Sequence, residues 1–252
     1  MLGVLTSMVT VPFTTVFKPI FDVVTNRVGS GVGTPLPRHP AHGDCIYLDY
    51  QATTPVWPEV AAAAAPFLTS HFGNPSSGHA FARPCAAAVK TARTNVAALI
   101  GAKDEEIIFT ACGSESDNHA IVGALEAEEE RRRTASDTSS PLPHVVASNI
   151  EHPAIEQCLE ALKKAGRLEV TYVSCDGEGR VSAEAVSSAC TAQTILVTVM
   201  HSNNEVGSVL PVAEITKAVK AAFPSVLVHT DAAQSIGKVD VFVDDLGVDL
   251  LT

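Results

Sequence analysis

The sequence predicts an α/β protein with a mostly parallel β-sheet flanked by helices. Short apolar segments rich in β-branched residues alternate with longer amphipathic segments, which is the pattern of strand–helix–strand units. The segment Thr194–Met200 is apolar or β-branched throughout, as expected of a strand that is buried on both faces. Strands that follow one another through helices pair in parallel.

The first part of the predicted domain is mainly helical. Pro58 suits a first helical turn, where its missing N–H needs no partner, and alanines continue this helix to about Ser70. An amphipathic pattern predicts a second helix from about Arg83 to Ile100. The short apolar run Ile107–Phe109 is the first predicted strand, and a helix follows it to about Glu130.

Strands and helices alternate after the polar segment Thr134–Pro143. His152-Pro153 marks the start of one helix, and Ser182 is a good N-cap for another. Val212–Phe223 has helical periodicity. The predicted strands are His144–Ser148, Glu169–Val173, Thr194–Met200, Val226–His229 and Val248–Leu251.

Composition limits the function classes. The chain has 252 residues, of which 46% are hydrophobic and 18% charged, so it has enough apolar material for a sizeable core. The net charge is -11, and the one basic cluster, Arg131–Arg133, directly follows three glutamates. We therefore expect small molecules and proteins as partners, with no nucleic acid and no membrane. None of the six cysteines forms a C-x-x-C pair or has zinc-finger spacing, so we expect reduced thiols and no metal site.

Residues 1–43 differ from the rest and have a single acid, Asp22. The apolar run Leu2–Phe17 has no base before it, and a membrane span would have to include Lys18 and Asp22, so neither a secretory signal nor an anchor is favoured. We predict a removable leader or a disordered extension here, followed by one domain over residues 44–252. The predicted location is the cytoplasm, or a mitochondrion or plastid if the extension is a transit peptide.

Polar or glycine-containing clusters directly follow four of the predicted strands. In open parallel sheets, ligands bind outside the carboxyl ends of the strands. We therefore expect the four clusters to meet along one edge of the sheet. They are Thr110–Ser116, Asn149–His152, His201–Glu205 and Thr230–Gln234.

Each cluster has both a functional and a structural interpretation. The Cys112–Ser116 helix start can bind an anion through its free N–H groups, or it is a simple N-cap. The imidazole of His152 can stack on a flat heteroaromatic ring and move protons, or it only caps its helix. Asn204 can donate to a ring oxygen, or it belongs to a turn.

Asp231 is the most informative of these residues, because an apolar strand places its carboxylate at a carboxyl end. A carboxylate that faces a pyridine nitrogen keeps the nitrogen protonated, which makes pyridoxal 5'-phosphate (PLP) an electron sink. The alternatives are an Asp that caps the next helix or binds a metal.

Six ordered motifs resemble the cysteine desulfurase and selenocysteine lyase family of fold type I PLP enzymes, and the resemblance runs from about Ile46 to Thr252. They are Tyr47–Pro55, Gly73–Ser77, Cys112–Asn118, Glu151-His152, Met200–Gly207 and His229–Gln234.

The resemblance implies the large, PLP-binding domain of a fold type I enzyme. It implies that Gly113 and Ser114 hold the cofactor phosphate, and that His152 stacks on the ring and assists proton transfer. Asn204 and Gln234 would contact the ring hydroxyl oxygen, and Asp231 the ring nitrogen. The implied reaction removes sulfur or selenium from L-cysteine or L-selenocysteine and gives L-alanine. A homodimer and a sulfur or selenium acceptor protein are the implied partners.

One departure concerns the lysine that binds PLP covalently in this family. The chain stops before the position of that lysine, and before the small domain and the loop with the nucleophilic cysteine. Lys238 is the only lysine near a motif, and it matches a family position with no catalytic role. We therefore expect the chain as given to be an incomplete large domain without turnover. Two alternatives are a non-catalytic truncated protein that binds a full-length partner, and another fold type I enzyme such as an aminotransferase.

Overall fold

The structure is a computed structural model that describes residues 47–137 and 139–252. These residues fall into two compact units, with the boundary between Val96 and Ala97. The prediction for residues 1–43 lies outside the described residues.

The unit that ends at Val96 contains helix α2 (Pro58–Thr69) and most of helix α3 (Ala82–Ile100), both where they were predicted. The loop between them depends on Gly73. A Cβ atom at this position would lie 2.1 Å from the Phe81 carbonyl oxygen, so only glycine allows the two backbone segments to approach this closely.

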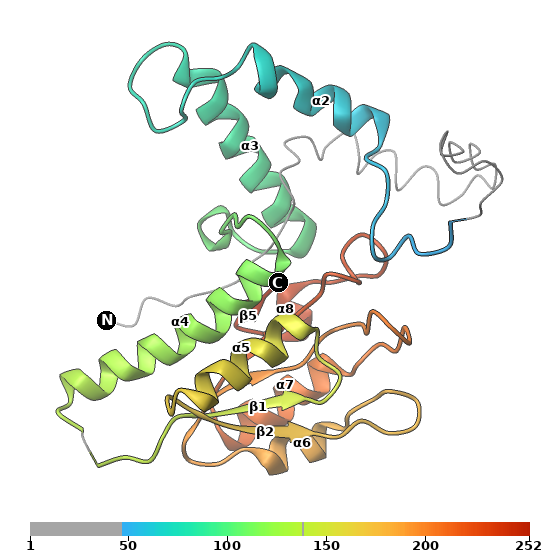
Figure 1. Cartoon of the computed structure of the whole chain (residues 1–252). Helices are drawn as coiled ribbons and strands as arrows, with labels where there is room; N and C mark the ends of the chain where they lie inside the picture. Colours follow the sequence, from blue (N-terminus) through green and yellow to red (C-terminus); the bar gives the residue numbers. More distant parts are fainter. Residues whose placement is uncertain (1–46, 138) are drawn as a thin grey trace. The chain divides into compact units, whose positions relative to one another are not determined.

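The second unit is built on a five-stranded parallel sheet, which confirms the predicted fold class (Figure 1). The order of the strands is β2-β1-β3-β4-β5. Their bounds are β1 (His144–Ser148), β2 (Glu169–Val173), β3 (Thr194–Thr198), β4 (Leu227–Thr230) and β5 (Leu250–Leu251).

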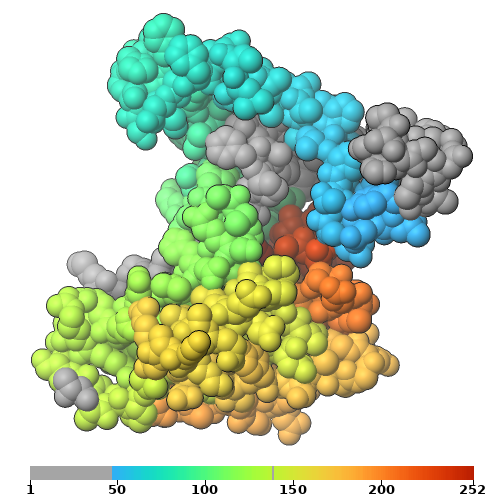
Figure 2. Space-filling model, viewed as in Figure 1, coloured from blue at the N-terminus to red at the C-terminus, as the bar shows by residue number. Residues whose placement is uncertain are grey.

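Helices cover both faces of this sheet. Helices α4 (Gly113–Thr134) and α5 (Pro153–Lys164) pack together on one face, where Figure 2 shows them as neighbouring green and yellow surfaces. Helices α6 (Ala183–Ala189) and α7 (Val212–Ala222) pack together on the other, and α7 also contacts the short α8 (Val243–Leu246). The connection from β1 to β2 runs in one direction across the sheet and the later connections run in the other. This reversal puts the crossover helices on opposite faces, because crossovers keep one hand.

Every second residue of a strand contributes to the core between the sheet and the α4–α5 layer, because successive side chains of a strand point to opposite faces. Val145 and Ala147 of β1 face this layer and are almost fully buried, as is Leu196 of β3. Val146 and Val197, which are also buried, belong to the opposite face. The central strands are therefore apolar on both faces, as predicted for β3.

The prediction of a strand at Ile107–Phe109 is wrong. A short 3-10 helix (η1, Asp104–Glu106) precedes this segment, and residues 107–109 are not assigned to a strand in the described part of the chain. Ile107 is nevertheless only 2% exposed, so its apolar character reflects burial in an irregular segment. Helix α4 continues to Thr134, four residues beyond the predicted end. No helix among the described residues is long and apolar enough to span a membrane.

Candidate functional site

The candidate site lies at the carboxyl edge of the sheet, where the strand order reverses between β1 and β3. Ligands of open α/β sheets bind in the crevice at such a switch point. The clusters after β1, β3 and β4 start at this edge because the three strands are parallel. The fourth cluster, at the start of α4, does not follow a strand. Its Ser116 Oγ lies 2.9 Å from Thr252 Oγ1, so the first turns of α4 are tied to the carboxyl end of β5.

Asp231 directly follows β4 and is only 6% exposed. Its Oδ1 accepts a hydrogen bond of 2.9 Å from Ala233 N, and its carbonyl oxygen accepts one of 2.7 Å from His201 N. Burial raises the pKa of Asp231, while the Ala233 N–H and the nearby His152 lower it. The carboxyl therefore closes a local turn instead of capping a helix. Among the described residues, no group of three or more His, Cys, Asp or Glu side chains could hold a metal ion.

His152 is the N-cap of α5, which does not exclude a functional role, and its ring also acts electrostatically on Asp231. Its Nδ1 accepts a hydrogen bond of 3.1 Å from Ala154 N. A nitrogen that accepts carries no proton, so the proton of the neutral ring is on Nε2. The cap fixes the ring at the switch point, and its stacking role stays a prediction.

The start of α4 has room for an anion. The N-cap Cys112 makes no side-chain capping bond, which leaves N–H groups of the first turn to other partners. A Cβ atom added to Gly113 would meet nothing within 4 Å, and Ser114 is exposed. Glu115 bends back and accepts a hydrogen bond of 2.6 Å from Ala111 N. The space at Gly113 and the uncapped first turn are compatible with the predicted phosphate site, whereas Glu115 adds a carboxylate to the same helix start; the phosphate role stays a prediction.

Asn204 and Gln234 lie on the loops after β3 and β4. Asn204 is half-buried, and its Nδ2 lies 3.3 Å from Glu205 Oε1. The ammonium of Lys238 donates a hydrogen bond of 2.9 Å to Gln234 Oε1. These contacts do not join either amide to Asp231, and the roles of both amides toward a shared ring stay predictions.

Two buried carboxyls at this edge are absent from the predicted site. Glu151 Oε1 accepts hydrogen bonds from Met200 N, at 2.9 Å, and from Ser148 Oγ, while Glu151 Oε2 is buried and has no hydrogen-bond partner. Burial raises the pKa of Glu151 to about 8; these two bonds oppose the rise, and the Asp231 and Asp117 carboxyls add to it. Glu151 is therefore neutral at pH 7, although glutamate is usually ionised there.

Asp117 lies on α4, is 2% exposed, and has an Oδ1 without a hydrogen-bond partner. Burial and the carboxyl of Asp231 raise the pKa of Asp117 to about 7, against a hydrogen bond from Thr252. The sequence contains a signal for this burial. Asp117 lies three and four positions before the buried Ala120 and Ile121, on the same face of the helix.

A buried polar network lies beneath these carboxyls. The ring of His229 bonds Thr198 Oγ1 through Nδ1, at 2.8 Å, and Thr252 Oγ1 through Nε2, at 3.0 Å. Burial lowers the pKa of His229 to about 3, so the ring is neutral. The distance of 3.9 Å between His229 Nε2 and Asp117 Oδ1 is therefore not an ion pair of two charged groups.

Asn203, to which the sequence assigns no role, fixes the loop after β3. Its Oδ1 accepts hydrogen bonds of 2.8 Å from both Glu205 N and Val206 N. Its Nδ2 donates to the Ile150 carbonyl oxygen at 3.1 Å, which joins this loop to the loop after β1.

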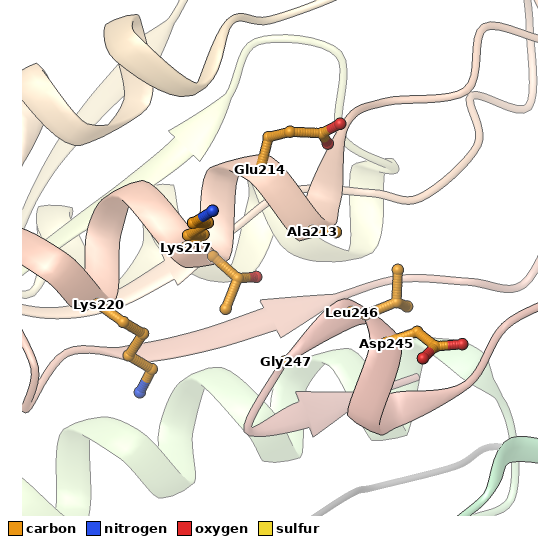
Figure 3. Close-up of a pocket in the computed structure, with 8 residues that line it drawn as sticks. Ala213, Glu214, Lys217, Lys220, Asp245, Leu246 and Gly247 are labelled. Carbon is orange, nitrogen blue, oxygen red and sulfur yellow. The ribbon is translucent and has the colours of Figure 1, made fainter.

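Two of the cavities that described residues of the second unit form are informative. A cavity of about 220 Å³ adjoins the site beside β1 and β2 and is lined by Ser148, Asn149, Glu151, Glu156 and Tyr172. A larger, open cavity of about 470 Å³ runs along α7 and α8 (Figure 3). The residues that line it, among them Lys217, Lys220 and Asp245, include none of the predicted site residues.

Comparison with known proteins gives consistent matches. The family model described as aminotransferase class-V matches residues 46–252. A cysteine desulfurase of Trichormus azollae is 42% identical over 207 residues, which are 82% of this chain and 48% of that protein. A selenocysteine lyase of Bos taurus is 38% identical over 231 residues, covering 85% of this chain and 53% of that protein. Among solved structures, SspA in complex with cysteine has a TM-score of 0.74 and 36% identity, over 82% of this chain and 56% of that chain. The chain thus spans about half the length of these relatives.

Proposed function

We propose that this chain, which belongs to the aminotransferase class-V family, forms the PLP-binding part of an enzyme that releases sulfur or selenium from L-cysteine or L-selenocysteine. The other product is L-alanine. The names of its relatives, cysteine desulfurase and selenocysteine lyase, support this reaction class. The observation that carries the proposal is the buried carboxyl of Asp231 at the switch point, within electrostatic reach of the His152 ring.

The residues at the carboxyl edge fit the two ends of PLP. The phosphate suits the start of α4, where the N–H groups of the first turn and the helix dipole favour an anion. Gly113 leaves space for it because no Cβ atom intrudes, and the exposed Ser114 hydroxyl offers a further donor. The pyridine ring of PLP fits the carboxyl edge of the sheet between His152 and Asp231.

Asp231 and His152 have different tasks in this arrangement. Bound PLP withdraws electrons from the α-carbon of the substrate when its ring nitrogen is protonated. Asp231 holds that proton on the nitrogen, because a carboxylate beside a pyridine favours the charged form of the ring. His152 presents a flat ring for stacking, and its Nε2 is the atom that can pass a proton, because Nδ1 is engaged in the helix cap.

A PLP titration of the chain, followed by absorbance and circular dichroism, tests the cofactor site. Asp231→Asn is expected to weaken binding by at least about 10-fold, since it removes a buried charge partner of the ring. The matched control is Asp240→Asn, because Asp240 is exposed and lies in the same connection between β4 and α8. Equal affinity in both variants would remove Asp231 from the site.

Chemical trapping tests the prediction about Lys238. Lys238 is exposed, and its ammonium bonds Gln234. Borohydride reduction of the PLP-saturated chain should leave this lysine unmodified in peptide maps. A PLP adduct mapped to Lys238 would contradict the prediction.

Product analysis of the natural protein tests the reaction class. Alanine, released together with sulfide, selenide or a protein-bound persulfide, supports the proposal. A 2-oxo acid as the product would instead indicate an aminotransferase.

A further inference from the structure

A pair of side chains joins the loops after β1 and β3 where the two strands stop pairing. The β1–β3 ladder ends at Ala147 and Thr198. Two residues later, Met200 N donates to Glu151 Oε1 in place of a backbone partner on β1. Asn203 makes the second connection, through Ile150 O. We call the Glu151 and Asn203 connections the β1–β3 clamp.

Glu151 is the central member of the clamp. Its Oε1 accepts hydrogen bonds both from a backbone N–H of the loop after β3 and from the hydroxyl of Ser148, at the end of β1. The groups that it joins are themselves buried, since Met200 is 2% and Ser148 1% exposed. Removing the carboxyl would therefore deprive a buried N–H group and a buried hydroxyl of this partner, which is costly.

We propose that Glu151 is a positioning residue, which fixes the separation of the β1 and β3 loops and thereby holds the neighbouring His152 ring at the cofactor site. His152 follows Glu151 directly in the chain, so a shift of the Glu151 backbone moves the helix cap and the ring together. The inference rests on the proposed function for the meaning of the site, but the clamp itself is tested without cofactor.

At neutral pH the Glu151 carboxyl makes the bonds of the clamp in its protonated, uncharged form. The groups that surround Glu151 are mostly acidic. Two carboxyls come from other elements, Asp117 of α4 and Asp231 after β4, while Glu156 of α5 and Tyr172 of β2 line the adjoining cavity. His152 is the nearby basic group, since it follows Glu151 in the chain and acts on Asp231. With a pKa of about 8, Glu151 is protonated at pH 7 and loses this proton above pH 8. Its ionisation then places a new negative charge beside His152, which the imidazole resonances of that residue report.

Three variants separate positioning from simple packing. Glu151→Gln keeps an oxygen that accepts from both donors but cannot ionise. Glu151→Ala removes the Glu151 connection of the clamp and leaves that of Asn203. Glu156→Gln is the matched control, because Glu156 lines the same cavity from the exposed surface of α5.

The first measurement uses the cofactor-free chain with 13C-labelled histidine, where His152→Gln identifies the resonance. The His152 signal should show an inflection near pH 8 in the wild type and in E156Q, and none in E151Q. In E151A the signal should be displaced at every pH, and the Met200 amide should exchange with solvent at least about 10-fold faster. Should E151A fail to fold, Glu151→Asp replaces it, because its shorter side chain cannot reach Met200 N.

The second measurement is PLP affinity at pH 7. E151Q and E156Q should remain within about 2-fold of the wild type, and E151A should bind at least about 10-fold more weakly. An E151A variant with the His152 signal, the Met200 exchange rate and the PLP affinity of the wild type would overturn the inference. If the wild type itself does not bind PLP, the proposed function fails, and the resonance and exchange measurements still decide whether the clamp positions His152.

Discussion

Replacing Asp117 by asparagine should make the protein more stable at neutral and alkaline pH. The carboxyl of Asp117 is buried next to a second carboxyl, Asp231, and its Oδ1 has no hydrogen-bond partner. An ionised carboxylate in this place is costly, because both burial and the like charge oppose it. An amide has nearly the same shape and never ionises, so the cost is absent from the variant.

The magnitude follows from the pKa of Asp117, which rises from the ordinary value of 3.8 to about 7. Between these values the unfolded chain is ionised at this position while the folded protein keeps its proton, so stability falls as pH rises. At about 1.4 kcal/mol per pH unit the total is about 4 kcal/mol, of which about 3 kcal/mol develops between pH 4.5 and 8. His229 contributes with the opposite sign, since its pKa is lowered to about 3 and its contribution is lost as pH falls below 6.5. The difference in unfolding free energy between D117N and the wild type at each pH does not contain the His229 contribution, because both proteins have it.

Urea denaturation followed by circular dichroism, at several pH values from 4.5 to 8, measures the difference. The advantage of D117N should grow by about 3 kcal/mol over this range, whereas Asp240→Asn, at an exposed position, should show no such growth. An advantage of D117N that stays constant within about 0.5 kcal/mol would refute the argument, because a buried ionising carboxyl must give a pH-dependent term.

Three further predictions concern single side chains. Asp231→Ala should abolish alanine formation by the natural protein while the circular dichroism spectrum of the folded protein is retained; unchanged turnover would contradict the role of this carboxyl. Gly179→Ala should lower the free energy of unfolding by about 1–2 kcal/mol, because φ at this glycine is +72° and a Cβ atom would lie 2.9 Å from Val206 Cγ2. Gly177→Ala, where a Cβ atom meets nothing within 4 Å, is its control in the same urea experiment. Ser182→Ala should cost about 1 kcal/mol in a thermal or urea melt, since the Ser182 hydroxyl caps α6 through Ala185 N.

Much of the fold follows from periodicity and from residues that start helices. The bounds of β1 and β2 are as predicted, and Pro58, His152 and Ser182 stand where their helices begin. The strand prediction for Ile107–Phe109 is wrong because a short apolar run indicates burial but does not determine the backbone conformation. The end of β3 was placed two residues late, because Val199 and Met200 are as apolar as the strand but leave the β1 ladder.

The position of the site could be predicted, but not all of its chemistry. The rule that ligands bind at the carboxyl ends of parallel strands places His152 and Asp231 on one edge, and the structure brings the two side chains within electrostatic reach of each other. Glu151 and Asp117 were given no role in the predicted site. The spacing of Asp117 from Ala120 and Ile121 indicates that it faces inward, whereas no such spacing marks Glu151. Their protonation depends on neighbours from other elements, such as Met200 and Thr252, that become neighbours only in the folded chain.

The hydrogen bonds of His229 also bear on how the protein assembles. The His229 imidazole bonds Thr198, 31 positions earlier, and Thr252, 23 positions later. Thr252 in turn bonds Ser116, which lies 136 positions before it. Every one of these bonds is long-range: the bond to Thr198 requires β3 beside β4, the bond to Thr252 requires the end of β5, and the Thr252–Ser116 bond requires α4 as well. A sheet that paired its strands out of register would enclose the same imidazole without partners, at a cost of about 1–3 kcal/mol for each lost bond. The ring thus disfavours misassembled sheets and couples the docking of α4 to the completion of the strands.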